Sequence, residues 1–108
     1  IRAHFEEYRK RGIRFVRDGG DHYGVSKRAA RLAPEYEIDY RTPVFAIYKE
    51  GHYGKIVGKS FSDMKEYHRR VLEAAAEGAD FIKIMTTGLL DFADHGKITG
   101  TPLSARSI

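Results

Sequence analysis

Cysteine is absent from all 108 residues of the chain. Without thiols the protein has neither a disulfide framework nor thiolate chemistry, which fits a cytoplasmic location. Long hydrophobic runs are missing too, because no apolar stretch approaches the roughly 20 residues that a membrane-spanning helix requires. We therefore expect no membrane partner. The length allows one small domain and is too short for two.

Charge of one sign is not concentrated in any part of the chain. The 19 Lys and Arg residues are interleaved with 15 Asp and Glu residues, leaving a net charge of +4. No basic stripe, aromatic-basic motif or helix-turn-helix pattern accompanies this charge, so we do not expect nucleic-acid binding. With 42% hydrophobic and 31% charged residues, the composition is that of a soluble globular protein.

Metal-binding motifs of histidine are also lacking. The five histidines show no His-x-His or His-Glu-x-x-His spacing, so none is predicted to be a metal ligand. We expect His4 and His68 on helix surfaces, and His22, His52 and His95 in loops.

The apolar pattern alternates between helical spacing and short runs of strand length. We expect, in order, helix 1–11, strand 13–18, helix 25–32, an irregular connection 33–41, strand 42–48, a helix that Ser60 and Asp63 cap and Gly78 ends, and a strand within 78–88. Strands that alternate with helices form a parallel sheet covered by helices. Three strands are too few for a closed barrel, so the α/β chain forms part of one or a small open sheet.

Lys83 lies in the middle of the last expected strand, where the pattern calls for an apolar residue. A buried cation costs several kcal/mol unless it is paired or neutral. Lys83 is therefore ion-paired, at the mouth of a cavity, or a functional group. By strand alternation Phe81 and Lys83 share one face, and Arg17 occupies the equivalent position in the first strand. If the helices cover the opposite face, both cations point away from them.

Two segments of the chain resemble a known family. The run GIRFVRDGG (12–20) and the run EGADFIKIMTTG (77–88), followed by LLDFADHGKITGTPLSAR (89–106), are similar to metal-dependent amidohydrolases, in the branch related to imidazolonepropionase and prolidase-like carboxypeptidases. The resemblance implies that residues 1–108 are one portion of a (β/α)8 TIM barrel. This portion would run from the end of the first barrel helix to the start of the fourth.

The resemblance also implies an enzyme that hydrolyses C–N bonds of a small amide or dipeptide. In such enzymes the lysine at the position of Lys83 carries a carbamate that bridges two divalent ions, usually zinc, and these activate a water molecule. The family's other metal ligands lie on strands that this chain does not reach. The alternative is a non-catalytic piece that self-associates through unpaired sheet edges or assembles with the rest of the barrel.

Further site residues follow from the position of loops in such barrels. Active sites are built at the C-terminal ends of the strands, which makes Tyr48, His52, Tyr53 and Thr86 candidate substrate contacts. Arg17 and Asp18 are expected to have structural roles near the site.

Overall fold

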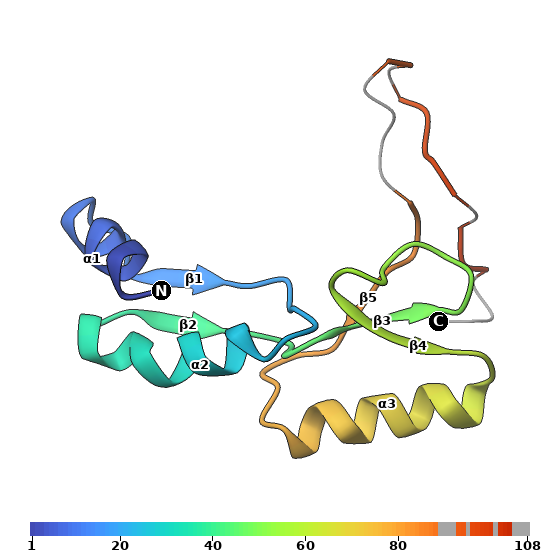
Figure 1. Cartoon of the computed structure of the whole chain (residues 1–108), viewed down its shortest axis with the longest axis horizontal. Coiled ribbons are helices and arrows are strands. Elements are labelled where there is room, and N and C mark those ends of the chain that lie inside the picture. Colours follow the sequence, from blue (N-terminus) through green and yellow to red (C-terminus); the bar gives the residue numbers. More distant parts are fainter. Residues whose placement is uncertain (89–92, 95, 101, 105–108) are drawn as a thin grey trace.

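The computed structural model describes residues 1–88, 93–94, 96–100 and 102–104. This part of the chain contains three α-helices and five short strands (Figure 1). The elements are α1 (Arg2–Lys10), β1 (Phe15–Arg17), α2 (Val25–Leu32), the 3₁₀ helix η1 (Ala33–Tyr36), β2 (Asp39–Arg41), β3 (Ala46–Lys49), β4 (Gly58–Phe61), α3 (Met64–Ala76) and β5 (Lys83–Ile84). All strand pairs are parallel, so the predicted α/β class with parallel strands is confirmed. No helix in the described ranges has both the length and the apolar character needed to span a bilayer.

Residues 39–49 form the centre of the structure. They contain β2, which pairs with β1, and β3, which lies between β4 and β5. The backbone N–H of Asp18 donates to the carbonyl of Arg41, and that of Asp80 donates to the carbonyl of Thr42, both at 2.8 Å. Successive carbonyls of an extended chain point to opposite edges. The ends of β1 and the residues that lead into β5 therefore lie on opposite sides of this segment.

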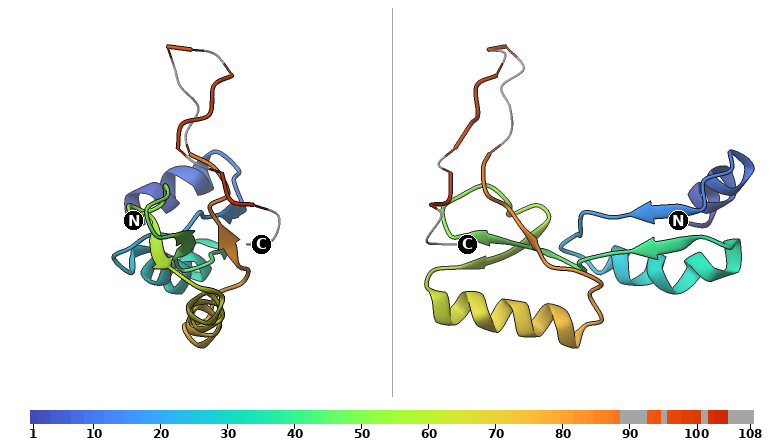
Figure 2. Two further views of the ribbon diagram at one scale, coloured as in Figure 1. Left: turned by 90° about the vertical axis from the view of Figure 1, so that its right-hand side faces the viewer. Right: turned by 180° about the vertical axis from the view of Figure 1, so that it is seen from behind.

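The helices pack on the sheets in two separate clusters. Phe5, Ala29, Ala33 and Ile38 form one with Val16 and Tyr40 of the first sheet, and Val44, Phe45, Ile47, Phe61 and Ala74 form the other with α3. In Figures 1 and 2, α2 and α3 run below the sheets while α1 lies beside β1. Val16 and Ile47 thus mark the faces of the two sheets that the helices cover.

The central segment is broken by a tight turn. The N–H of Phe45 donates to the carbonyl of Pro43 at 2.8 Å, around Val44, whose φ is 68°. This is a γ-turn of the strained kind, and Pro43 has no N–H to contribute to a ladder. The prediction of one strand over 42–48 is therefore wrong. The chain instead forms β2 within the stretch expected to be irregular, and β3 begins at Ala46.

The N-terminus of α3 also differs from the prediction. The helix is capped by Asp63, whose carboxylate accepts from the N–H of Glu66 at 2.7 Å. The proposed cap, Ser60, belongs to β4, a strand that was not predicted. Phe61, at 2% exposure, pairs with the end of β3 and joins the core from the strand.

The face of α3 that packs on the core is not the one with the most large apolar residues. Tyr67, Val71 and Ala74 contact the core, whereas Met64 and Leu72, which have the spacing of an apolar stripe, are exposed. A core face is selected by what the helix packs against, and here that partner is the β3–β4 pair.

Candidate functional site

Lys83 lies on the face of the second sheet that α3 does not cover. In the β3–β5 pair, Lys83 is opposite Ala46 and Ile84 is opposite Ile47. Ile47 packs in the α3 cluster, and neighbouring side chains of a strand point to opposite faces. The half-buried Lys83 therefore has the orientation that alternation predicts.

Lys83 lies at an open cavity of about 230 Å³. The cavity is lined by Arg17, Asp18, Gly19, Phe81 and Lys83. The Nζ atom of Lys83 lies 3.6 Å from the position that a Cβ on Gly19 would take, so the side chain reaches the end of β1. The sequence left three possibilities for Lys83, namely an ion pair, the mouth of a cavity or a functional group. A lysine at a cavity fits this geometry. Within the described ranges Lys83 makes no ion pair.

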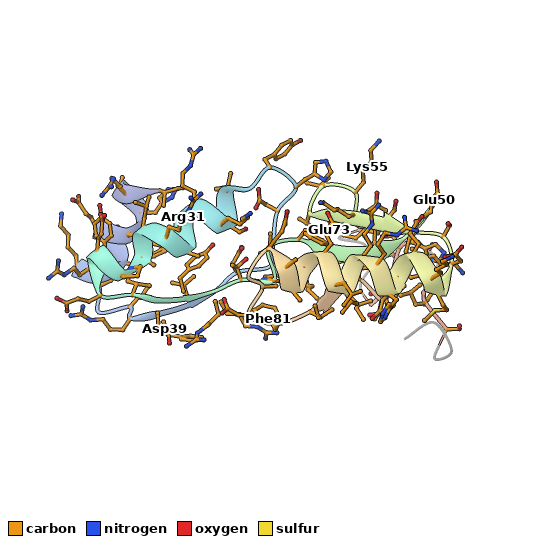
Figure 3. All side chains as sticks on the ribbon, turned by 90° about the horizontal axis from the view of Figure 1, so that it is seen from below. Arg31, Asp39, Glu50, Lys55, Glu73 and Phe81 are labelled. Carbon is orange, nitrogen blue, oxygen red and sulfur yellow. The ribbon has the colours of Figure 1, made fainter. Side chains whose placement is uncertain are left out.

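Arg17 is fixed against the aromatic side chain in this cavity. Its guanidinium carbon lies 4.5 Å from the centroid of Phe81, a cation–π contact. In Figure 3, Phe81 lies midway along the molecule and beside the layer formed by α2 and α3. No ion pair of Arg17 occurs in the part of the chain that the structure describes. The cavity thus has two cations and one carboxylate in its lining.

That carboxylate, Asp18, is already hydrogen-bonded. The hydroxyl of Thr42, a residue at 2% exposure, donates to Oδ2 of Asp18 at 2.9 Å. Burial, and then the negative charge of Asp18, raise the pKa of the Tyr40 hydroxyl well above its usual value. Tyr40 therefore remains protonated. This network was missed from the sequence because β2, which positions both Tyr40 and Thr42, was not predicted.

Asp80 holds the start of the lysine strand. Its Oδ2 atom accepts from the N–H of Thr42 at 2.9 Å, while its own N–H donates to the Thr42 carbonyl at 2.8 Å. Arg41 adds an ion pair at 3.8 Å. These two hydrogen bonds between Asp80 and Thr42 fix the register three residues before Lys83.

Two of the predicted substrate contacts belong to β3 and the loop after it. Tyr48 is on the same face as Lys83, two residues beyond Ala46. A Cβ on Gly54 would lie 2.5 Å from the Cβ of Tyr48, so the loop backbone rests directly on that side chain. His52 is half-buried in this loop, and its N–H donates to the carbonyl of Lys49 at 2.9 Å.

The other two predicted substrate contacts are Tyr53, further along the same loop, and Thr86, after β5. Tyr53 is half-buried, and Thr86 is exposed, with its carbonyl accepting from the N–H of Leu103 at 2.8 Å. Among the described residues, the lining of the Lys83 cavity includes none of the four substrate candidates. Their roles remain predictions.

A metal site is not formed by the described residues alone. They contain no group of three or more His, Cys, Asp or Glu that could hold an ion. The Nδ1 atom of His22 lies 3.2 Å from the carbonyl oxygen of Gly58. His95 and residues 89–92, 101 and 105–106 of the resembling segment lie outside the described residues, as do residues 107–108.

Comparisons of the chain with models of known protein families, with curated proteins and with solved structures find no match. The site is therefore defined by its own geometry. It is a half-buried lysine in a small cavity, on the face of a parallel α/β layer that no helix of the described residues covers.

Proposed function

We propose that this chain forms part of an amidohydrolase barrel and supplies Lys83 to the active site as a carbamate. The parallel order of residues 15–21, 39–49 and 80–85 supports the barrel. β1 pairs in parallel with β2, and β5 pairs in parallel with β3, as neighbouring strands of such a barrel do.

The observation that carries the proposal is the environment of Lys83. Its amine reaches a cavity with Arg17 and meets no carboxylate partner in the described ranges. Carbamylation would replace this cation by an anion with two oxygens, a group suited to bridging divalent ions. The described residues do not fit a zinc site by themselves, so the two zinc ions rest on the family resemblance. A small amide or dipeptide is the proposed substrate.

Substitution of Lys83 tests the proposal in the full-length protein. Lys83→Met keeps the aliphatic stem and removes the nitrogen, and we expect hydrolysis of a panel of dipeptides and cyclic amides to fall to background. Lys59→Met is the matched control, because Lys59 is also a partly exposed strand lysine but pairs with Glu73 on the helix-covered side. Circular dichroism checks that both variants fold. Full activity of Lys83→Met would contradict the proposal.

A second candidate function is structural, as a self-associating unit. The chain exposes 7429 Å², whereas a compact monomer of 12.3 kDa exposes about 6,100 Å². Light scattering across a concentration series tests this candidate. We expect a mass of at least twice that of one chain, and a monomer at every concentration would exclude it.

A further inference from the structure

Arg17 and Lys83 come from strands on opposite sides of residues 39–49, yet their side chains line the same cavity. Phe81 precedes Lys83 by two residues on the same face, and its ring lies 4.5 Å from the guanidinium carbon. The ring therefore fixes Arg17 beside the lysine. Within the described residues Arg17 forms no ion pair with Asp18, whose carboxylate accepts a hydrogen bond from the Thr42 hydroxyl.

We propose that Arg17 is the positioning residue for the carbamate of Lys83, donating hydrogen bonds to its oxygens and balancing its negative charge. This inference rests on the proposed function, since it requires that Lys83 is carbamylated. A guanidinium presents a planar fork of donors that matches a group with two coplanar oxygens. Oxygen ligands are commonly held by such outer hydrogen-bond partners.

Formation of the carbamate on Lys83 needs only CO₂ as a reactant and water as the proton acceptor. The Lys83 ammonium first gives one proton to water. The neutral amine then attacks the carbon of CO₂, the N–C bond forms, and one C=O π pair moves onto oxygen. An N–H proton then passes to water, which leaves the carbamate anion. The lining changes from two cations and one carboxylate to one cation, one carbamate and one carboxylate, and Arg17 is the cation that remains.

Carbon-13 NMR of the full-length protein in labelled bicarbonate tests the role of Arg17. The wild type should show a carbamate resonance that saturates with bicarbonate concentration. For Arg17→Met we expect the concentration at half-saturation to rise about tenfold or more. Arg14→Met is the control, because it removes the same charge from a surface ion pair with Glu37 and should leave the value unchanged.

The outcomes separate the two proposals. A wild type without a carbamate resonance overturns the proposed function, and the role of Arg17 with it. A carbamate that forms equally well in Arg17→Met overturns the role of Arg17 alone. If Arg17→Met does not fold, Phe81→Leu gives the answer, because it keeps both cations and removes the ring beneath the guanidinium. For Phe81→Leu we expect the bicarbonate concentration at half-saturation to rise about two- to fivefold. An unchanged concentration would overturn the inference.

Discussion

Val44 combines burial with a backbone conformation that β-branched residues rarely adopt. It is 4% exposed and has a φ of 68°, a left-handed conformation that costs roughly 1–2 kcal/mol for an L-residue. Its N–H donates to the Thr42 hydroxyl at 3.0 Å. The same hydroxyl donates to Asp18 in the cavity. The strained turn is therefore connected to the Lys83 site through a single side chain.

Substituting Val44 tests this strain. Val44→Ala and Val44→Gly both remove buried methyl groups, at a cost of about 2 kcal/mol. In an ordinary strand glycine is about 0.5–1 kcal/mol worse than alanine, but at position 44 glycine also relieves the positive φ. We expect Val44→Gly to be at least as stable as Val44→Ala in urea denaturation.

The same pair of substitutions at Val16 is the control. Val16 is a half-buried β1 residue outside the set of non-glycine residues with positive φ. Glycine should be less stable than alanine there. If the glycine variant is less stable than the alanine variant by the same amount at positions 16 and 44, then Val44 stores no strain.

At the scale of elements, the start of α2 depends on Asp21. Its carboxylate accepts hydrogen bonds from the N–H groups of Tyr23, Val25 and Ser26 at 2.8, 3.0 and 2.9 Å, and from the Ser26 hydroxyl at 2.7 Å. Burial by itself raises the pKa of Asp21. These hydrogen bonds, led by those from Ser26, outweigh it and lower the pKa below its ordinary value of 3.8.

Asp21→Ala should therefore destabilise the protein in a pH-dependent way. Near neutral pH we expect a loss of about 1–2 kcal/mol in the free energy of unfolding, similar to that for removal of a capping side chain, because Asp21 accepts from the first N–H groups of α2. A lowered folded-state pKa gives stability that is fully present above the unfolded pKa and is lost as pH falls through the folded one. The gap between wild type and variant should thus shrink below about pH 4.

Urea denaturation across that pH range measures the gap, with Glu6→Ala on the exposed face of α1 as the control for loss of one charge. A gap that stays constant down to pH 2 would contradict this role of the Asp21 carboxylate.

Local pattern was sufficient for some elements and insufficient for others. The helix predicted over 25–32 is α2, Val25–Leu32, because a helix is defined by bonds within its own residues. β2 and β4 were missed. Asp39–Arg41 and Gly58–Phe61 are short and largely polar, and they are strands because β1 and β3 lie beside them, which no local pattern encodes.

The candidate site also has a part that the sequence predicted and a part that it did not. Alternation along one strand was enough to predict the face of Lys83. The neighbours of the lysine were harder to predict, since the hydrogen bond from Thr42 to Asp18 and the effect of Asp18 on Tyr40 depend on the register of β1 with β2. The γ-turn at Val44, which divides the expected 42–48 strand, shows in the sequence only as an ordinary apolar residue after Pro43.

The whole molecule is flat, with extents of 41 × 38 × 21 Å and a radius of gyration of 15.8 Å. A compact chain of this length has a radius of gyration of about 13 Å. The core is divided into two clusters rather than one. The helices cover Val16 and Ile47, which leaves the face with Arg17 and Lys83 without a helix among the described elements (Figure 2).

Phe15 makes this open face testable. It is 57% exposed and points away from Val16, which packs against the helices. Exposed apolar faces promote association, so Phe15→Ser should lower the mass that light scattering measures for the 108-residue chain. Leu72→Ser is the matched control, because Leu72 is also 57% exposed but lies on α3. Equal dissociation by both variants would show that the open face is not the contact.

The same substitution separates the two candidate functions in the full-length protein. In a closed barrel Phe15 faces the interior, where strands on the far side would cover it. Phe15→Ser would then create a cavity in a monomer and lower its free energy of unfolding by about 3 kcal/mol or more, without a change in mass. If the open face is instead a surface between copies, the variant should shift the mass and leave the stability of the dissociated chain nearly unchanged. Light scattering and urea denaturation of one variant therefore tell a barrel wall from a self-associating layer.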